Sequence, residues 1–180
     1  VCSSDLACHS DQALAMLDDA SPAERDVLGA FPYQTNDATL HTDARLLPRR
    51  PLARAAWNYH LTSHPQERVP VTYDMNTLQS IEAPVRFLLT LNRDADIDPA
   101  TIIGRYRYDH PVYTPAAVAA QGERLRVSGV NRSYYCGAYW RYGFHEDGVV
   151  SGLWALQDFA CATHGAPPPA PILQPTRRSR

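Results

Sequence analysis

Two short stretches near the start of the chain carry apolar residues at helical spacing. Residues 11–17 combine good helix formers with this spacing, which predicts a helix capped by Ser10 or Asp11. Ser21 and Glu24 then have the spacing of a capping box, in which each side chain accepts a hydrogen bond from the other residue's backbone N–H group. A second helix is therefore expected to begin after Ser21 and to end at the next Phe-Pro pair.

The middle of the chain changes to the two-residue alternation that is typical of β-strands. Residues 69–75 alternate apolar and polar side chains, and residues 85–91 form a nearly continuous apolar run that suits a buried strand. Prolines between these segments supply the turns that a meandering antiparallel sheet needs. The five predicted strands are residues 38–42, 55–60, 69–75, 85–91 and 102–108.

The last third of the chain predicts a helix, a short strand and a closing helix. An alanine-rich helix is expected over residues 116–121, an aromatic strand over residues 134–136, and a helix with apolar residues at helical spacing over residues 146–161. A further strand at residues 6–8 is expected to belong to a parallel sheet that begins upstream of the chain. The predicted fold class is therefore α+β.

The composition narrows the classes of partner. The chain has 180 residues, of which 44% are hydrophobic and 20% charged, as in an ordinary globular protein. Its 17 basic and 19 acidic side chains give a net charge of -2, so no basic face for nucleic acid is expected. The sequence has no run of about 18 apolar residues that could span a membrane, and no secretory signal is visible.

Cysteine and histidine residues give no pattern of metal ligands. The four cysteines lack the paired spacing of a zinc site, and we expect them to be reduced thiols in a cytoplasmic protein. His41, His60 and His64 are too scattered along the chain to predict a shared metal ion. We therefore expect no metal site.

The most informative segment, residues 134–152, joins a strand, a glycine, an aromatic loop and a helix. Gly137 and Gly143 let the backbone approach a flat or bulky group. Glu146 and Asp147 lie in the first turn of the helix, whose unpaired N–H groups and positive dipole end suit an anion or a polarised carbonyl oxygen. The helix also carries two glycines four residues apart, which narrow one of its faces. By themselves, these features fit a tightly packed helix start equally well.

Residues 143–152, Gly-Phe-His-Glu-Asp-Gly-Val-Val-Ser-Gly, are similar to the C-terminal FAD-binding motif of the flavin amine oxidase family. That family includes monoamine oxidases, protoporphyrinogen oxidases and phytoene desaturases. The resemblance implies that this helix N-terminus faces the pyrimidine end of the flavin, with the backbone N–H near His145 hydrogen-bonded to the C2 carbonyl oxygen. It also implies that Gly137 lies beside the ribityl chain and the pyrophosphate. The residues implied in FAD binding are Gly137, Ala138, Gly143, Phe144, His145, Glu146 and Gly148.

The sequence departs from the family pattern in two ways. Many members carry an acidic residue one or two positions after the first glycine, where this chain has Ala138 and Tyr139. The dinucleotide fingerprint G-x-G-x-x-G is also absent, so we expect a C-terminal fragment without the N-terminal half that holds the ADP part of FAD.

The resemblance implies a substrate-domain sheet, antiparallel or mixed, joined to the C-terminal strand, loop and helix of a Rossmann-like FAD-binding domain. The expected organisation is residues 1–30 as the end of a FAD-domain strand with connecting helices, 31–114 as the substrate-domain sheet, 115–165 as the FAD-binding motif and helix, and 166–180 as a disordered tail.

Four aromatic or histidine residues are candidates for lining a substrate pocket: Trp57, Tyr73, His110 and Trp140. For Trp57, the favoured alternative is a core side chain flanked by the surface residues Asn58 and Tyr59. His110 could carry a proton, but a hydrogen-bonded structural histidine is the favoured alternative. No catalytic residue can be named from the sequence.

The leading functional hypothesis is a flavoenzyme. Its complete chain would transfer a hydride from a C–N or C–C bond of a small or lipid-like substrate to FAD, and the electrons would pass on to an acceptor. Two alternatives stay open: a non-enzymatic α+β binding module, and a fragment without activity of its own.

Overall fold

The computed structural model describes residues 4–61 and 67–165, which divide into two compact units. Unit 1 comprises the described residues up to Tyr33 and those from Pro111 onward, and unit 2 comprises residues 34–110. Both helices and strands are present, so the predicted α+β class is confirmed. None of the helices in these residues combines the length and the apolar character needed to cross a bilayer. The tail predicted at residues 166–180 lies outside the described residues.

Unit 1 is built around two parallel strands. β1 (Ser4–Ala7) pairs with β7 (Ser133–Cys136), and Leu6 lies opposite Tyr135 in the register. The prediction that the first strand belongs to a parallel sheet is therefore confirmed, although the two strands lie more than 120 positions apart in the sequence.

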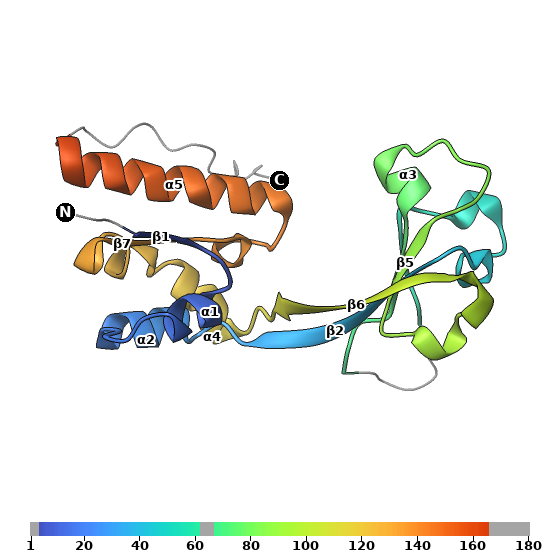
Figure 1. Ribbon diagram of the computed structural model, residues 1–180, viewed down its shortest axis with the longest axis horizontal. Coiled ribbons are helices and arrows are strands. Elements are labelled where there is room, and N and C mark those ends of the chain that lie inside the picture. The colour runs from blue at the N-terminus through green and yellow to red at the C-terminus, as the bar shows by residue number, and fades with distance from the viewer. Residues whose placement is uncertain (1–3, 62–66, 166–180) are drawn as a thin grey trace, which may run out of the picture. The chain divides into compact units, whose positions relative to one another are not determined.

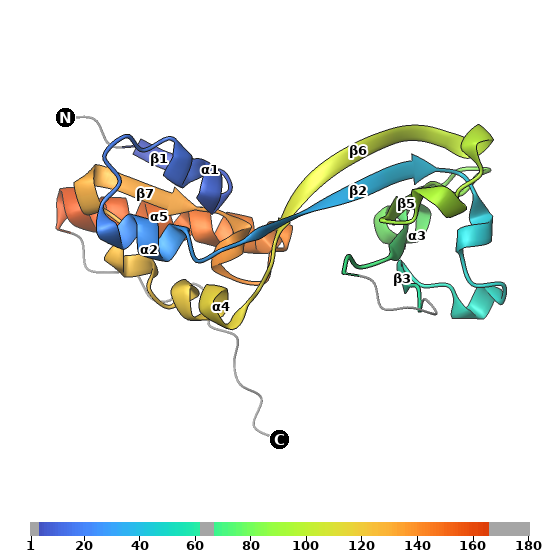
Figure 2. The same cartoon turned by 90° about the horizontal axis from the view of Figure 1, so that it is seen from below.

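Helices cover both faces of this pair (Figure 1). Three short helices lie on one face and the long helix α5 (His145–His164) lies on the other, and Figure 2 shows the short helices from their own side. The capping box is confirmed, since Glu24 N–H donates to Ser21 Oγ at 3.2 Å and Ser21 N–H donates to Glu24 Oε2 at 2.7 Å. The predicted cap of the first helix is wrong by one residue, because His9 occupies the N-cap position. The short helices are α1 (Ser10–Ala15), α2 (Pro22–Leu28) and α4 (Pro115–Gln121).

The core of unit 1 is apolar and aromatic. Phe31 meets the rings of Tyr139 and Trp140 edge-on, with centroids 5.1 and 5.6 Å apart. One buried polar pair crosses this core, where the Tyr135 hydroxyl donates to Glu24 Oε1 at 2.5 Å. The buried core residues are Ala13, Val27, Leu28, Phe31, Ala117, Ala120, Val127, Tyr135, Tyr139 and Trp140.

Unit 2 is a five-stranded antiparallel sheet with the strand order β3-β4-β5-β2-β6. All five predicted strands are present, although the apolar run at residues 85–91 forms a strand only from Leu88 onward. A short helix, α3 (Met75–Gln79), follows β4 and is capped by Asp74, which accepts a hydrogen bond from Thr77 N–H. The strands are β2 (Tyr33–His41), β3 (Trp57–Tyr59), β4 (Val71–Asp74), β5 (Leu88–Leu91) and β6 (Ile102–Pro111).

The two faces of this sheet differ in polarity. One row of directly opposed residues, Asn58, Thr72, Thr90 and Thr39, is polar and buried, and we call this side the threonine face. Because successive side chains of a strand point to opposite sides, their neighbours form an apolar second face. This second side, the aromatic face, carries Trp57, Tyr59, Val71, Tyr73, Leu89 and Leu91.

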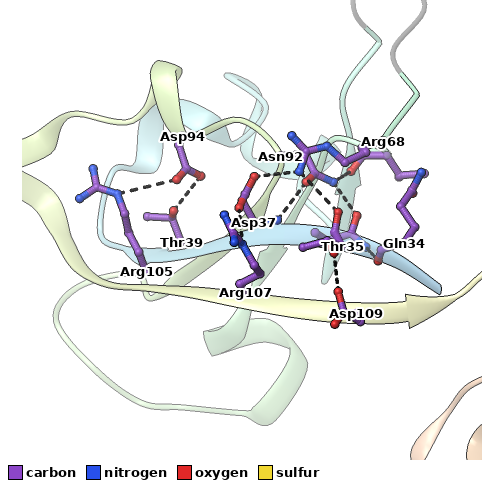
Figure 3. Close-up of polar contacts among 12 residues, drawn as sticks. Gln34, Thr35, Asp37, Thr39, Arg68, Asn92, Asp94, Arg105, Arg107 and Asp109 are labelled. Carbon is purple, nitrogen blue, oxygen red and sulfur yellow. Dashed lines mark hydrogen bonds and ion pairs between the residues drawn. The ribbon is translucent and has the colours of Figure 1, made fainter. Parts of the chain in front are cut away.

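Polar contacts between β2 and β6 continue the threonine face to the edge of the sheet (Figure 3). Thr35 donates to Asp109, and Asp37 is ion-paired with Arg107 and with Arg68, at N–O distances of 3.6 and 2.8 Å. The charged side chains of β6 therefore lie on the threonine face, and the alternate residues of β6 lie on the aromatic face. Those alternate residues include Tyr106, Tyr108 and His110.

The structure overturns the favoured expectation for Trp57. Its side chain is 51% exposed and meets Tyr73 edge-on at 5.3 Å, whereas the flanking Asn58 is buried. Asn58 can be buried because its amide group bonds both backbone groups of Ala55, at 2.7 and 3.1 Å. The core position of β3 is thus filled by the amide and the surface position by the tryptophan.

Candidate functional site

The candidate site begins where β1 and β7 end. A Cβ atom added to Gly137 would lie 2.3 Å from the Tyr139 ring and 3.2 Å from the Cys8 carbonyl oxygen, so only glycine fits between them. The Gly137 N–H donates to Ser151 Oγ at 2.8 Å, which ties the strand end to α5. Gly137 therefore serves close packing at the carboxyl edge of the parallel pair.

Asp147 organises the loop between Gly137 and α5. Its Oδ2 accepts hydrogen bonds from the backbone N–H groups of Tyr142 and Phe144, at 3.1 and 3.0 Å. Its Oδ1 lies 3.4 Å from Arg141 Nε, and the carboxylate is buried. Gly143 takes the left-handed conformation, with φ at 88°, so the turn into the helix needs a glycine at this position.

The N-terminus of α5 keeps donor groups available. Asp147 N–H and Gly148 N–H both bond the Phe144 carbonyl oxygen, at 3.0 and 3.2 Å. The N–H groups of His145 and Glu146 have no hydrogen-bond acceptor among the described residues. A helix of 20 residues adds its dipole to these donors, so a polarised oxygen would be stabilised here.

Tyr139 leaves a polar atom unsatisfied next to this edge. Its hydroxyl is the one buried side-chain polar atom in the described part of the chain that has no hydrogen-bond partner. Burial raises the pKa of this hydroxyl, so it stays a neutral O–H group that can donate a hydrogen bond. A buried hydroxyl without a partner costs roughly 1–3 kcal/mol, which a bound ligand could recover.

Two glycines on α5 face open space. A Cβ atom added to Gly148 or Gly152 would meet nothing within 4 Å. Val149 and Leu153, on the same side of the helix, are exposed, so both sides of α5 carry apolar residues. A helix with this pattern is typical of one that is covered on two sides in a larger domain.

A cavity of about 420 Å³ lies beside the loop, and six of the described residues line it. One of them, Tyr113, places its hydroxyl only 2.7 Å from where a Cβ atom of Gly143 would be. Burial, with a smaller contribution from the Asp147 carboxylate, raises the pKa of Tyr113 to about 12. Trp140 also lines this cavity, although it is only 3% exposed and donates from Nε1 to the Tyr135 carbonyl oxygen at 3.0 Å.

The other pocket candidates lie in unit 2. Trp57 and Tyr73 are neighbours on the aromatic face, and His110 lies on the same face at the end of β6. His110 Nδ1 accepts a hydrogen bond from the Asn36 amide at 3.0 Å. The structure therefore brings Trp57 and Tyr73 together, whereas Trp140 belongs to unit 1.

Sequence reasoning missed three residues that shape the candidate site. The sequence marks Asp147 only as a helix-favouring acid, although its position three residues after Phe144 is the spacing of a capping residue. Ser151 and Tyr139 gave no signal, because their partners are set by the packing of α5 on β7. No group of three or more possible metal ligands occurs among the described residues.

The residues at this edge fit a flavin in part. The donors of His145 and Glu146, the unsatisfied Tyr139 hydroxyl and the open side of Gly148 are compatible with a bound ring and its polar chain. The Cβ side of Gly137 is filled by Tyr139 and is not available to a ligand.

In comparisons with known proteins, no protein-family model matches the sequence, and no curated protein matches it significantly.

Proposed function

We propose that the chain is the C-terminal part of a FAD-dependent oxidoreductase of the flavin amine oxidase type. The observation that carries the proposal is the N-terminus of α5, which follows the carboxyl end of β7 and whose His145 and Glu146 N–H groups have no acceptor among the described residues. In open α/β sheets, ligands bind outside the carboxyl ends of the strands.

The chain's own residues would bind and orient the cofactor. His145 and Glu146 would offer backbone N–H groups to the C2 carbonyl oxygen of the flavin, and Gly148 would leave room beside them. The Tyr139 hydroxyl would donate to a polar atom of the ribityl chain, in place of the acidic residue that many family members carry. FAD, when bound, supplies the acceptor for a hydride, and the protein supplies binding, orientation and electrostatics.

The aromatic face of unit 2 supports an apolar substrate. Trp57 and Tyr59 are exposed, and Tyr106 and Tyr108 extend the same face along β6. Accessible apolar surface of this kind usually marks a binding site. We propose that this face of unit 2 binds the apolar part of a small or lipid-like molecule.

A two-stranded parallel sheet also favours a part of a larger domain over a self-contained binding module. Parallel sheets are normally larger and covered by helices on both faces, and two strands alone give little stability. Unit 1 has the helices on both faces but only two strands between them among the described residues. Upstream sequence of the same chain would supply the missing strands.

The test is the visible absorption spectrum of the protein expressed with its upstream coding sequence. Bound flavin gives bands near roughly 370 and 450 nm, which come from the cofactor itself. We expect these bands in the parent protein and their loss in Gly148→Leu, whose new side chain would fill the open side of the helix. Ala162→Leu is the matched control, because Ala162 is exposed near the other end of α5.

A folded, colourless parent that takes up no added FAD would exclude the flavoenzyme. Equal loss of flavin in Gly148→Leu and Ala162→Leu would argue that α5 is merely destabilised and that its N-terminus does not face the cofactor.

A further inference from the structure

Unit 2 contains a second cavity, unrelated to the loop before α5. Its volume is about 420 Å³, and it lies between residues 45–49 and the outer strand β3. Of the described residues, three arginines and one histidine line it: Arg45, Arg49, Arg93 and His60. Asp96 supplies the only carboxylate among these described lining residues.

The charges around this cavity do not balance. Arg45 forms a two-bond pair with the buried carboxylate of Asp43, at 2.8 and 2.6 Å. Arg93 Nε donates to Asp96 at 2.7 Å. Arg49 forms no ion pair or hydrogen bond with any of the described residues. Among the described residues, Arg49 is therefore the arginine of this lining that has no carboxylate partner, whereas Arg45 also interacts with the Asp98 carboxylate.

A chain of buried hydrogen bonds runs from this cavity across the threonine face. His60 Nε2 lies 2.8 Å from Thr72 Oγ1, and Thr72 Oγ1 lies 2.8 Å from Thr90 Oγ1. Thr90 Oγ1 lies 2.8 Å from Nε2 of His41, which is fully buried. These hydrogen bonds thus link a histidine at the cavity, His60, to a histidine in the interior, His41, through two threonines.

The His41 end of this series of hydrogen bonds determines which group donates in each bond. Asp43 N–H donates to His41 Nδ1 at 3.1 Å, so that nitrogen carries no proton and Nε2 must carry it. His41 Nε2 therefore donates to Thr90, Thr90 donates to Thr72, and the Thr72 hydroxyl donates to His60. His60 Nε2 is then an acceptor, and the ring keeps its proton on Nδ1.

The hydrogen-bond chain also keeps His60 neutral. Protonation at Nε2 would place two donors face to face at Thr72 and break the sequence of bonds. Burial and the nearby Arg93 lower the pKa of His60, and the Asp96 carboxylate offsets this only in part. At neutral pH the ring therefore offers one N–H donor, at Nδ1, in a cavity that already carries cationic donors.

We propose that this cavity binds a small organic carboxylate, held by Arg49 together with Arg45, Arg93 and the Nδ1–H group of His60. The guanidinium of Arg49 matches one carboxylate, whose planar oxygens fit its donors. Leu46, Leu47 and Pro48 line the same cavity and would contact the apolar body of such a ligand. The site lies in unit 2 alone, so the proposal does not depend on the flavin.

Benzoate is the probe for this site, titrated into the 180-residue chain at constant ionic strength. The readout is the nuclear magnetic resonance signals of the His60 ring nitrogens, which report both its tautomer and its surroundings. We expect an Nδ1–H tautomer and a saturable shift with benzoate, and none with the neutral analogue benzamide. Arg49→Gln should weaken binding roughly tenfold, the usual effect of losing a charge-assisted hydrogen bond.

Arg50→Gln is the matched control, because Arg50 is an exposed neighbour with the same charge that does not line the cavity. It should leave the affinity within about twofold, since an exposed charge that does not line the cavity interacts with the ligand only through water. Equal weakening by the two variants, equal binding of benzamide, or an Nε2–H tautomer of His60 would overturn the proposal. Phenyl phosphate tests the other oxyanion, and its binding without any binding of benzoate would also contradict the assignment.

Discussion

Units 1 and 2 bury opposite kinds of side chain against their strands. In unit 1, the strand pair packs on apolar and aromatic residues such as Leu28 and Trp140. In unit 2, the buried threonine face is polar, whereas the aromatic face keeps Trp57 and Tyr59 accessible. Apolar packing therefore buries the strand pair of unit 1, whereas in unit 2 hydrogen bonds hold part of the buried face and part of the apolar surface stays accessible.

The largest expected loss of stability is that of replacing a buried tryptophan, and an exposed tryptophan provides the comparison. Trp140→Ala should destabilise the chain by about 3–5 kcal/mol, because it empties a buried aromatic site. Trp57→Ala should cost less than about 1.5 kcal/mol, since a ring that is 51% exposed leaves no buried cavity when it is removed. Urea unfolding followed by circular dichroism measures both values. Equal losses would contradict the contrast between the two units.

The threonine face is tested by removing its hydroxyl groups. Thr90→Val should cost about 1–3 kcal/mol, because the ring proton of His41 and the hydroxyl of Thr72 both lose a partner. The double variant Thr72→Val with Thr90→Val should cost less than the sum of the two single changes, since fewer polar groups are left unsatisfied. Strict additivity in urea unfolding would show that the hydroxyl groups do not act as a chain.

Acidification should weaken unit 2 through His41. Burial lowers the pKa of His41, and the carboxylates of Asp43 and Asp94 offset this only in part. The unfolded chain therefore takes up the proton first, so the contribution to stability is complete above about pH 6.5 and falls as the pH drops below that value. Thermal unfolding from pH 8 to pH 5 measures the loss, and His41→Gln should reduce it. An unchanged slope in that variant would assign the loss to other groups.

The smallest effect is expected at the open side of α5. Gly148→Ala and Gly152→Ala should each stabilise the 180-residue chain by about 0.5–1 kcal/mol, because alanine has the higher helix propensity and the added Cβ meets nothing within 4 Å. Thermal unfolding would detect the gain. A loss of stability would mean that these glycines are already packed against part of the chain.

Local signals in the sequence predicted most of the elements. The capping box at Ser21 and Glu24 depends on residues three apart, so the pattern contains both partners. The alternation in β4 likewise revealed two faces of a strand, but it did not tell which face is buried. That choice depends on residues far away, since Thr72 is satisfied by Thr90, and Thr90 by His41.

The candidate sites were harder to predict from the sequence, because they also depend on residues that are far apart along the chain. Gly143 and its neighbours formed a recognisable segment, whereas Tyr139 gave no sign that its hydroxyl would be buried without a partner. The cavity that we propose binds a carboxylate combines His60 with arginines from two separate loops. A histidine in a sequence does not reveal its tautomer, because the proton position is set by partners that only folding brings together.

The directed hydrogen-bond chain on the threonine face has a consequence for how this protein can change over time. Each member is tolerated only while its neighbour supplies the complementary donor or acceptor, so single replacements at positions 60, 72, 90 and 41 are penalised. Replacing neighbouring members together removes both halves of a bond and avoids much of that penalty. In diverged copies of this sequence, we therefore expect these four positions to covary, either retained as a set or exchanged as a set for apolar residues.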